Sequence, residues 1–140
     1  MDASPDNINS LLYGFSIALQ PGHLLFVFAG CFLGTLVGIL PGIGPVGAIS
    51  ILLPITFQMS STGAIVLLAG VYYGVMYGGS TASILVNVPG ETASVVTCLD
   101  GYRMARQGRA GPALGIAAFG SFIAGTAGLI GLQLIAAPLS

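Results

Sequence analysis

The segment from Asn7 to Gly90 contains a single ionisable side chain besides tyrosine and cysteine, that of His23. Soluble domains carry about a quarter charged residues, whereas this chain of 140 residues is 55% hydrophobic and 5% charged. A chain with so little charge cannot cover itself with a polar surface, and its natural solvent is a lipid bilayer. Because helices satisfy their backbone hydrogen bonds internally, we predict an all-α, polytopic integral membrane protein with broken or re-entrant helices at Gly and Pro motifs.

Continuous apolar stretches define the predicted spans, since a membrane-crossing helix needs about 20 mostly apolar residues. The whole chain, 1–140, is interpreted as one transmembrane region whose spans lie at about 11–40, 45–57, 63–88 and 113–139. Pro21 and Gly22 mark a break or an interfacial bend inside the first span. Pro41 and Pro45 argue against a straight helix between the first two spans, because proline removes a backbone donor and clashes with the preceding turn.

Three arginines, Arg103, Arg106 and Arg109, lie in the loop at 91–112. Because Lys and Arg in short loops stay in the cytoplasm, this loop is predicted to be cytoplasmic. An N-terminus outside the cytoplasm would then require the 45–57 segment to cross the bilayer. An N-terminus inside would require a re-entrant hairpin instead, and the three arginines leave both topologies open.

Charge and cysteine content disfavour several classes of function. The net charge is −1 and the three Lys and Arg residues are all arginines, so no basic surface for nucleic acid is expected. Cys31 and Cys98 lack the spacing of a zinc site or a disulfide framework, and no metal or cofactor is predicted. The N-terminus lacks the positively charged region of a secretory signal, so we expect no cleavage.

Glycines recur at every fourth position in two of the predicted spans. One stripe consists of Gly30, Gly34 and Gly38, and the other of Gly70, Gly74 and Gly78. Small residues at this spacing let membrane helices approach closely. We therefore predict that both stripes are helix-packing surfaces.

A first candidate site lies in the run LPGIGPVGAISILLPITF, at Pro41, Gly42, Gly44 and Pro45. The glycines match the dinucleotide fingerprint G-x-G-x-x-G, but that motif needs a preceding strand and a downstream acidic residue, which this sequence lacks. A glycine-rich turn that opens a helix still presents free N–H groups and a positive dipole end to an anion. Transporters use broken helices in this way at their substrate sites.

A second candidate site lies in the run YYGVMYGGSTASILVNVPGE, which is too polar for a helix that faces lipid. Gly78 and Gly79 are expected to loosen the helix, and Pro89 and Gly90 to end it. Hydroxyl and amide groups beside such a break can bind a carboxylate or a dehydrated cation, although they also serve as hydrogen bonds between helices. The candidate residues are Tyr77, Gly78, Gly79, Ser80, Ser83, Asn87, Pro89 and Gly90.

Two acidic residues, Glu91 and Asp100, fall in the predicted loop before the arginines. The pair Asp100 and Gly101 is typical of a turn. Ionisable residues near a membrane are candidates for function, so both carboxylates are interpreted either as ion-coupling groups or as structural parts of the loop.

The chain resembles a known family in three runs, LPGIGPVGAISILLPITF, YYGVMYGGSTASILVNVPGE and TCLDGYRMARQGRAGPALGIAA. These runs are similar to the large membrane subunit, TctA-type, of bacterial tripartite tricarboxylate transporters, and the resemblance extends from about Leu11 onward. Members are several times longer and contain two related halves. The resemblance therefore implies that 1–140 is the N-terminal part of a larger permease, a fragment or a truncated product, whose glycine stripes would lack partners.

The resemblance implies a multi-pass protein of the bacterial inner membrane that transports tricarboxylates or related organic anions by secondary active transport. Its partners would be a periplasmic solute-binding protein, a small membrane subunit, the carboxylate substrate and the lipid bilayer. A gradient of Na⁺ or H⁺ would drive transport, with the ion moving together with the substrate by symport. The sequence lacks a phosphate-binding loop motif, which agrees with the use of an ion gradient rather than ATP. The two candidate sites would form the tips of broken helices that bind the carboxylate and the coupling ion.

Two other functions are alternatives to transport. A passive channel or a structural membrane subunit would show no coupling to an ion gradient. An intramembrane hydrolase with Ser80 as its nucleophile would need a base within hydrogen-bond reach. His23, the single histidine, lies before the clearly apolar block of the first span, which starts at about Leu24, and there is no lysine to replace it. We therefore predict no enzymatic activity and no catalytic residues.

Overall fold

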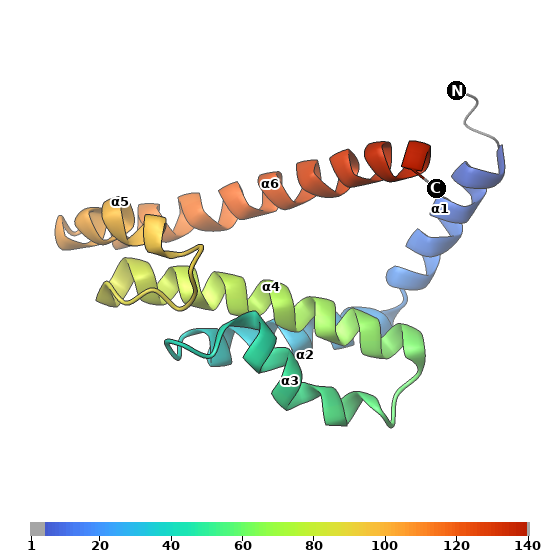
Figure 1. Ribbon diagram of the computed structural model, residues 1–140, viewed down its shortest axis with the longest axis horizontal. Helices are drawn as coiled ribbons and strands as arrows, with labels where there is room; N and C mark the ends of the chain where they lie inside the picture. The colour runs from blue at the N-terminus through green and yellow to red at the C-terminus, as the bar shows by residue number, and fades with distance from the viewer. Residues whose placement is uncertain (1–4, 140) are drawn as a thin grey trace.

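The computed structural model describes residues 5–139, and these form six helices and no strand (Figure 1). The helices are α1 (Pro5–Ala18), α2 (Pro21–Gly38), α3 (Gly44–Thr56), α4 (Ser61–Val86), α5 (Val95–Arg106) and α6 (Ala110–Leu139). By length and composition, α2, α4 and the 110–133 part of α6 could each cross a membrane. The predicted all-α, polytopic membrane fold is confirmed.

The breaks between the first helices lie where proline and glycine predicted them. Pro21 occupies the first turn of α2, where its missing N–H costs no hydrogen bond. The break is also held by His23, whose Nδ1 lies 2.7 Å from the carbonyl oxygen of Ile17. The interval from Ile39 to Ile43 separates α2 from α3, so the helix break expected around Pro41 is confirmed.

The two glycine stripes pack against each other along α2 and α4. A Cβ added at Gly30 would collide with the backbone of Leu67 and Val71, and one added at Gly38 would collide with the backbone of Val75. The contacts advance in the same direction on both helices, so α2 and α4 run parallel. The close packing predicted from the stripes is confirmed, but the expectation that they would lack partners is wrong, because each stripe packs against the backbone of the opposite helix.

The contact between α2 and α4 is nearly symmetric. Gly34 meets the backbone of Val71, and Gly74 meets the backbone of Cys31, so equivalent residues are related by a shift of 40 positions. The pairs formed by Gly30 and Gly70, and by Gly38 and Gly78, follow the same shift. Two parallel helices with one spacing of glycines can pack in this way around a local two-fold axis.

A small core lies where α3 crosses the α2 and α4 pair. Ala48, Val71 and Val75 are buried there, and Val37, Ile49 and Leu52 pack around them. The α3 helix has 13 residues, which corresponds to about 20 Å. It is thus shorter than the roughly 30 Å hydrocarbon core of a bilayer, and the link at 57–60 completes the return to α4.

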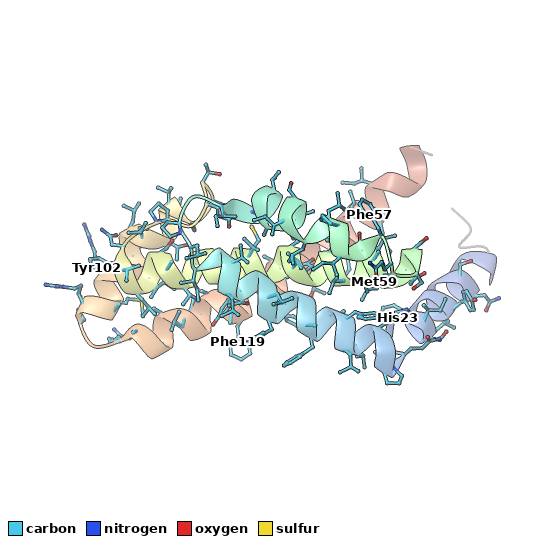
Figure 2. All side chains as sticks on the ribbon, turned by 90° about the horizontal axis from the view of Figure 1, so that it is seen from below. His23, Phe57, Met59, Tyr102 and Phe119 are labelled. Atoms are coloured by element: carbon cyan, nitrogen blue, oxygen red, sulfur yellow. The ribbon has the colours of Figure 1, made fainter. Side chains whose placement is uncertain are left out.

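The helix breaks after α2 and after α4 lie at the same end of the bundle. Figure 2 places His23, Phe57 and Met59 toward one end and Tyr102, on α5, at the other. In Figure 1 the connections that follow α2 and α4 both lie at the α5 end. The α5 helix, which carries the exposed Arg103, lies at that end as well.

Candidate functional site

The first break gives the chain an unusual backbone between α2 and α3. Gly42 and Gly44 have φ angles of +92° and +60°, and Ile43 between them is right-handed, with φ −77° and ψ −45°. Positive φ strains any residue with a Cβ, which explains why glycine occupies both positions. Pro45 follows in the first turn of α3, where its fixed φ favours the start of a helix.

The amide groups of this break lie in a turn at 41–43 that is too loose for a regular backbone hydrogen bond. Among the described residues, the N–H groups of Gly42, Ile43 and Gly44 donate to no backbone carbonyl, and no side chain caps the start of α3. Successive amides in alternating left-handed and right-handed conformations form a concave nest that attracts anions. The positive end of the α3 dipole adds to that attraction. We call Gly42, Ile43 and Gly44 the amide nest.

The second break follows α4 and is held by one buried hydroxyl. Asn87 ends α4 in the left-handed conformation, with φ 59° and ψ 29°. The Ser94 hydroxyl then donates to the Glu91 carbonyl at 2.9 Å and accepts from the Glu91 amide at 3.2 Å. Ser94 is 2% exposed. Sequence reasoning missed this residue, because its single signal was a hydroxyl three positions after Glu91.

The two breaks meet through glycine. A Cβ added at Gly90 would lie 2.5 Å from the Gly79 Cα and 2.9 Å from the Gly38 carbonyl oxygen. Real Cβ atoms essentially never approach other atoms so closely. Gly90 is therefore required so that the chain after α4 can lie against the end of α2.

The breaks line an open hollow of about 510 Å³, which we call the break pocket. One wall is the amide nest with Pro45 and Val46, and the other comes from the second break. The residues that line it are Gly42, Ile43, Gly44, Pro45, Val46, Pro89, Gly90, Glu91, Thr92 and Val95. The structure thus brings together six sequence-predicted site residues from two distant motifs: Gly42, Gly44, Pro45, Pro89, Gly90 and Glu91.

Glu91 supplies the one charged side chain among these lining residues. Burial raises the pKa of the Glu91 carboxyl above its ordinary value, because the charged form loses hydration. The pocket walls are otherwise apolar side chains and backbone. An anion that entered the pocket would find amide donors on one side and a carboxyl group on the other.

Other sequence-predicted residues lie outside the break pocket. Pro41 is exposed beside it. The Ser83 hydroxyl is fully buried and donates to the Gly79 carbonyl at 2.9 Å, so it serves the helix itself. Ser80 is half-buried, and Asn87 is exposed.

Two local predictions are wrong. Gly78 and Gly79 do not loosen their helix, since α4 continues from Ser61 to Val86. Gly78 is used instead for close packing, because a Cβ there would lie 2.5 Å from the Thr35 carbonyl oxygen. Asp100 and Gly101 form no turn, because they lie inside α5, where Gly101 packs against Ile84 of α4.

Tyr77 lines a different hollow, which we call the tyrosine groove. This groove has a volume of about 670 Å³ and lies between α2, α4 and α6. Tyr73 and Tyr77 face it from α4, and its other lining residues are Val27, Cys31, Ala69, Gly70, Ala118, Ser121, Phe122, Gly125, Thr126 and Leu129. The structure therefore separates Tyr77 from the glycine and proline residues with which the sequence grouped it.

Within residues 5–139, the described His, Cys, Asp and Glu side chains form no group of three that could hold a metal ion. The arginines Arg103, Arg106 and Arg109 are exposed, and none lines the break pocket. Recognition of an anion in this pocket would therefore depend on backbone amides.

Comparison with known proteins gives the family. A family model described as "Tripartite tricarboxylate transporter TctA family" matches residues 24–140, which include both breaks and the pocket between them. The chain is also 53% identical over 135 residues to an Agrobacterium vitis protein described as "Uncharacterized 52.8 kDa protein in TAR-I ttuC' 3'region". That alignment covers 96% of the chain and 27% of the relative.

The chain thus spans about a quarter of the length of this relative. No solved structure matches the chain. The family match covers most of the sequence and agrees with the helices that are long and apolar enough to cross a membrane. The chain belongs to the TctA family of tripartite tricarboxylate transporters.

Proposed function

We propose that this chain is part of the membrane subunit of a secondary transporter that carries tricarboxylates or related organic anions across the bacterial inner membrane. A periplasmic solute-binding protein would deliver the substrate, and a small membrane subunit would complete the complex. A gradient of Na⁺ or H⁺ would drive transport by symport. Membership of the TctA family supports this role for the complete protein.

The observation that carries the proposal is the amide nest in the break pocket. A carboxylate has acceptor oxygens only, and the free amides of Gly42, Ile43 and Gly44 are donors without partners among the described residues. Hydrogen bonds to a charged group contribute about 1.5–3 kcal/mol each. A nest with apolar walls can therefore bind an organic anion without an arginine or a lysine.

Two features of the site favour transport over permanent binding. A backbone nest has no formal positive charge, so an anion bound there can leave again without separating from a paired cation. The site also lies between two helix breaks, and transporters commonly alternate access by moving broken helices around a fixed site. The break pocket is lined by the start of α3 and by the segment that joins α4 to α5, so relative movement of these segments would open or close it.

The uptake of radiolabelled citrate by cells that express the complete protein with its two partners tests the proposal. Gly42→Ala should lower uptake about tenfold or more, because a Cβ in the left-handed region costs about 1–2 kcal/mol and turns the amides away from the substrate. Gly108→Ala is the matched control. Gly108 has a φ of +75° and nothing within 4 Å of its added Cβ, as at Gly42, but it lies outside the pocket.

Equal uptake by both variants at normal membrane abundance would exclude the nest as the carboxylate site. An ionophore that collapses the gradients distinguishes the transporter from a passive channel or a structural subunit, because only coupled uptake should cease. The hydrolase alternative gains no support. His23 lies at the opposite end of the bundle from α5 (Figure 2), and its Nδ1 is occupied by the Ile17 carbonyl.

A further inference from the structure

Glu91 lies in the wall of the break pocket opposite the amide nest. The reciprocal hydrogen bonds with the buried Ser94 fix its backbone. Its stem lies against α4, since a Cβ added at Gly79 would be 3.7 Å from the Glu91 Cγ. Glu91 is therefore part of the wall of the break pocket, with its side-chain stem against α4.

No described residue neutralises this carboxyl group. Within residues 5–139, no side chain forms an ion pair or a hydrogen bond with the Glu91 carboxylate. The α3 helix, which forms the opposite wall, has no titratable side chain. The titratable or charged side chains on the other two neighbouring helices are Tyr72, Tyr73 and Tyr77 on α4 and Cys98, Asp100, Tyr102, Arg103 and Arg106 on α5.

None of these side chains lines the break pocket. Tyr73 and Tyr77 line the tyrosine groove on the other side of α4. Arg103 and Arg106 are exposed, as is Asp100. The state of Glu91 is thus set by its partial burial and by whatever enters the break pocket.

An ionised Glu91 and a carboxylate substrate in one pocket would repel each other. When two carboxylates share a site, one of them takes up a proton at a pH where it would otherwise be ionised. We propose that Glu91 is the coupling residue of the transporter, and that it binds one proton from solution when an organic carboxylate enters the break pocket. The proton returns to solution from the Glu91 carboxyl when the substrate leaves on the other side.

This inference rests on the proposed function, and it narrows the coupling ion from Na⁺ or H⁺ to H⁺. Its physical basis is the reciprocity of linked binding, because a substrate that favours protonated Glu91 must itself bind more tightly as the pH falls. Over the pH range in which Glu91 is ionised in the empty pocket, the affinity for the carboxylate substrate should rise by about tenfold for each unit that the pH falls, as for linkage to a single proton.

The test is citrate binding to the complete transporter in lipid vesicles, measured between mildly acidic and mildly alkaline pH. Citrate itself titrates in this range, so each variant is compared with the wild type at the same pH. Glu91→Gln should bind citrate more tightly than the wild type at alkaline pH and as tightly as the wild type at acidic pH, so the extra pH dependence should disappear. Asp100→Asn, which removes an exposed carboxylate outside the pocket, should behave as the wild type.

A pH-indicator dye measures the proton directly. The wild type should take up one more proton per citrate bound than Glu91→Gln does, in sodium-free buffer. Equal proton uptake by the two proteins, or a variant that loses only a response to Na⁺, would overturn the inference. Failure of the proposed function gives a different result, because Gly42→Ala would then bind citrate as the wild type does.

Discussion

Replacement of Gly34 by alanine tests the close contact between α2 and α4. The added Cβ would lie 2.9 Å from the Val71 Cα and would overlap the Val71 carbonyl oxygen, whereas ordinary van der Waals contact begins at about 3.4 Å. The atoms of Val71 in the contact belong to the backbone, so no side-chain rotation can make room. The two helices must therefore move apart by about half an ångström or more.

That separation weakens contacts along the whole interface. Overpacking of this kind costs about 1–3 kcal/mol, and the better helix propensity of alanine returns about 0.8–1 kcal/mol. We expect a net loss of up to about 2 kcal/mol. The local symmetry of the pair predicts a similar loss for Gly74→Ala, since Gly74 meets Cys31 as Gly34 meets Val71.

Thermal unfolding of the purified protein in detergent measures this loss. The matched control is Gly120→Ala, inside α6, where nothing lies within 4 Å of an added Cβ. The control should be neutral or should gain up to about 1 kcal/mol from helix propensity. If Gly34→Ala unfolds at the same temperature as Gly120→Ala, the two helices are not in backbone contact and the parallel pairing of the glycine stripes is incorrect.

Three further predictions concern the second break. Gly90→Ala should destabilise the protein and abolish uptake, because its Cβ would collide with backbone at Gly79 and Gly38. Gly79→Ala should be tolerated, because the atom nearest to its added Cβ lies at 3.5 Å. Thermal unfolding and uptake assays would distinguish the two variants. Asn87→Ala should lose about 1 kcal/mol at the left-handed end of α4 and Asn87→Gly should not, so equal melting temperatures would argue against that cap. Burial raises the pKa of the Glu91 carboxyl above its ordinary value of 4.5. At low pH the carboxyl is protonated in both the folded and the unfolded state and costs the folded state nothing, so the folded state should lose stability as the pH rises through the raised pKa. Glu91→Gln should therefore melt at a higher temperature than the wild type near neutral pH and lose this advantage in acid, and a constant difference across the pH range would contradict the shift.

The sequence predicted the break after α2 well because its causes are local. Pro41 and Pro45 lack amide donors, and Gly42 and Gly44 accept positive φ, so a helix could not continue through these residues whatever surrounded them. The same local chemistry predicted that α4 would end near Pro89. The error at Gly78 and Gly79 has the opposite origin, because glycine permits either a loose helix or a close contact, and the facing backbone of α2 decided between them.

The composition of the candidate site depended on contacts that no local pattern contains. The sequence placed Tyr77 beside Gly79 because they are two positions apart, but neighbouring positions on a helix face different directions. Tyr77 accordingly faces the tyrosine groove, while Glu91 returns to line the break pocket. Ser94 was overlooked because a serine becomes informative only when its hydroxyl is buried against a particular backbone.

The sequence by itself determined that the chain is helical and belongs in a membrane, because charge content and apolar length act on each segment separately. It also determined where the helices break, since proline and glycine act on their own backbone. Only the tertiary structure decided that α2 and α4 run parallel, that Gly90 lies against Gly38, and that the amide nest faces Glu91 across one pocket. These features depend on which backbones approach within van der Waals contact, and that distance is set by both partners together.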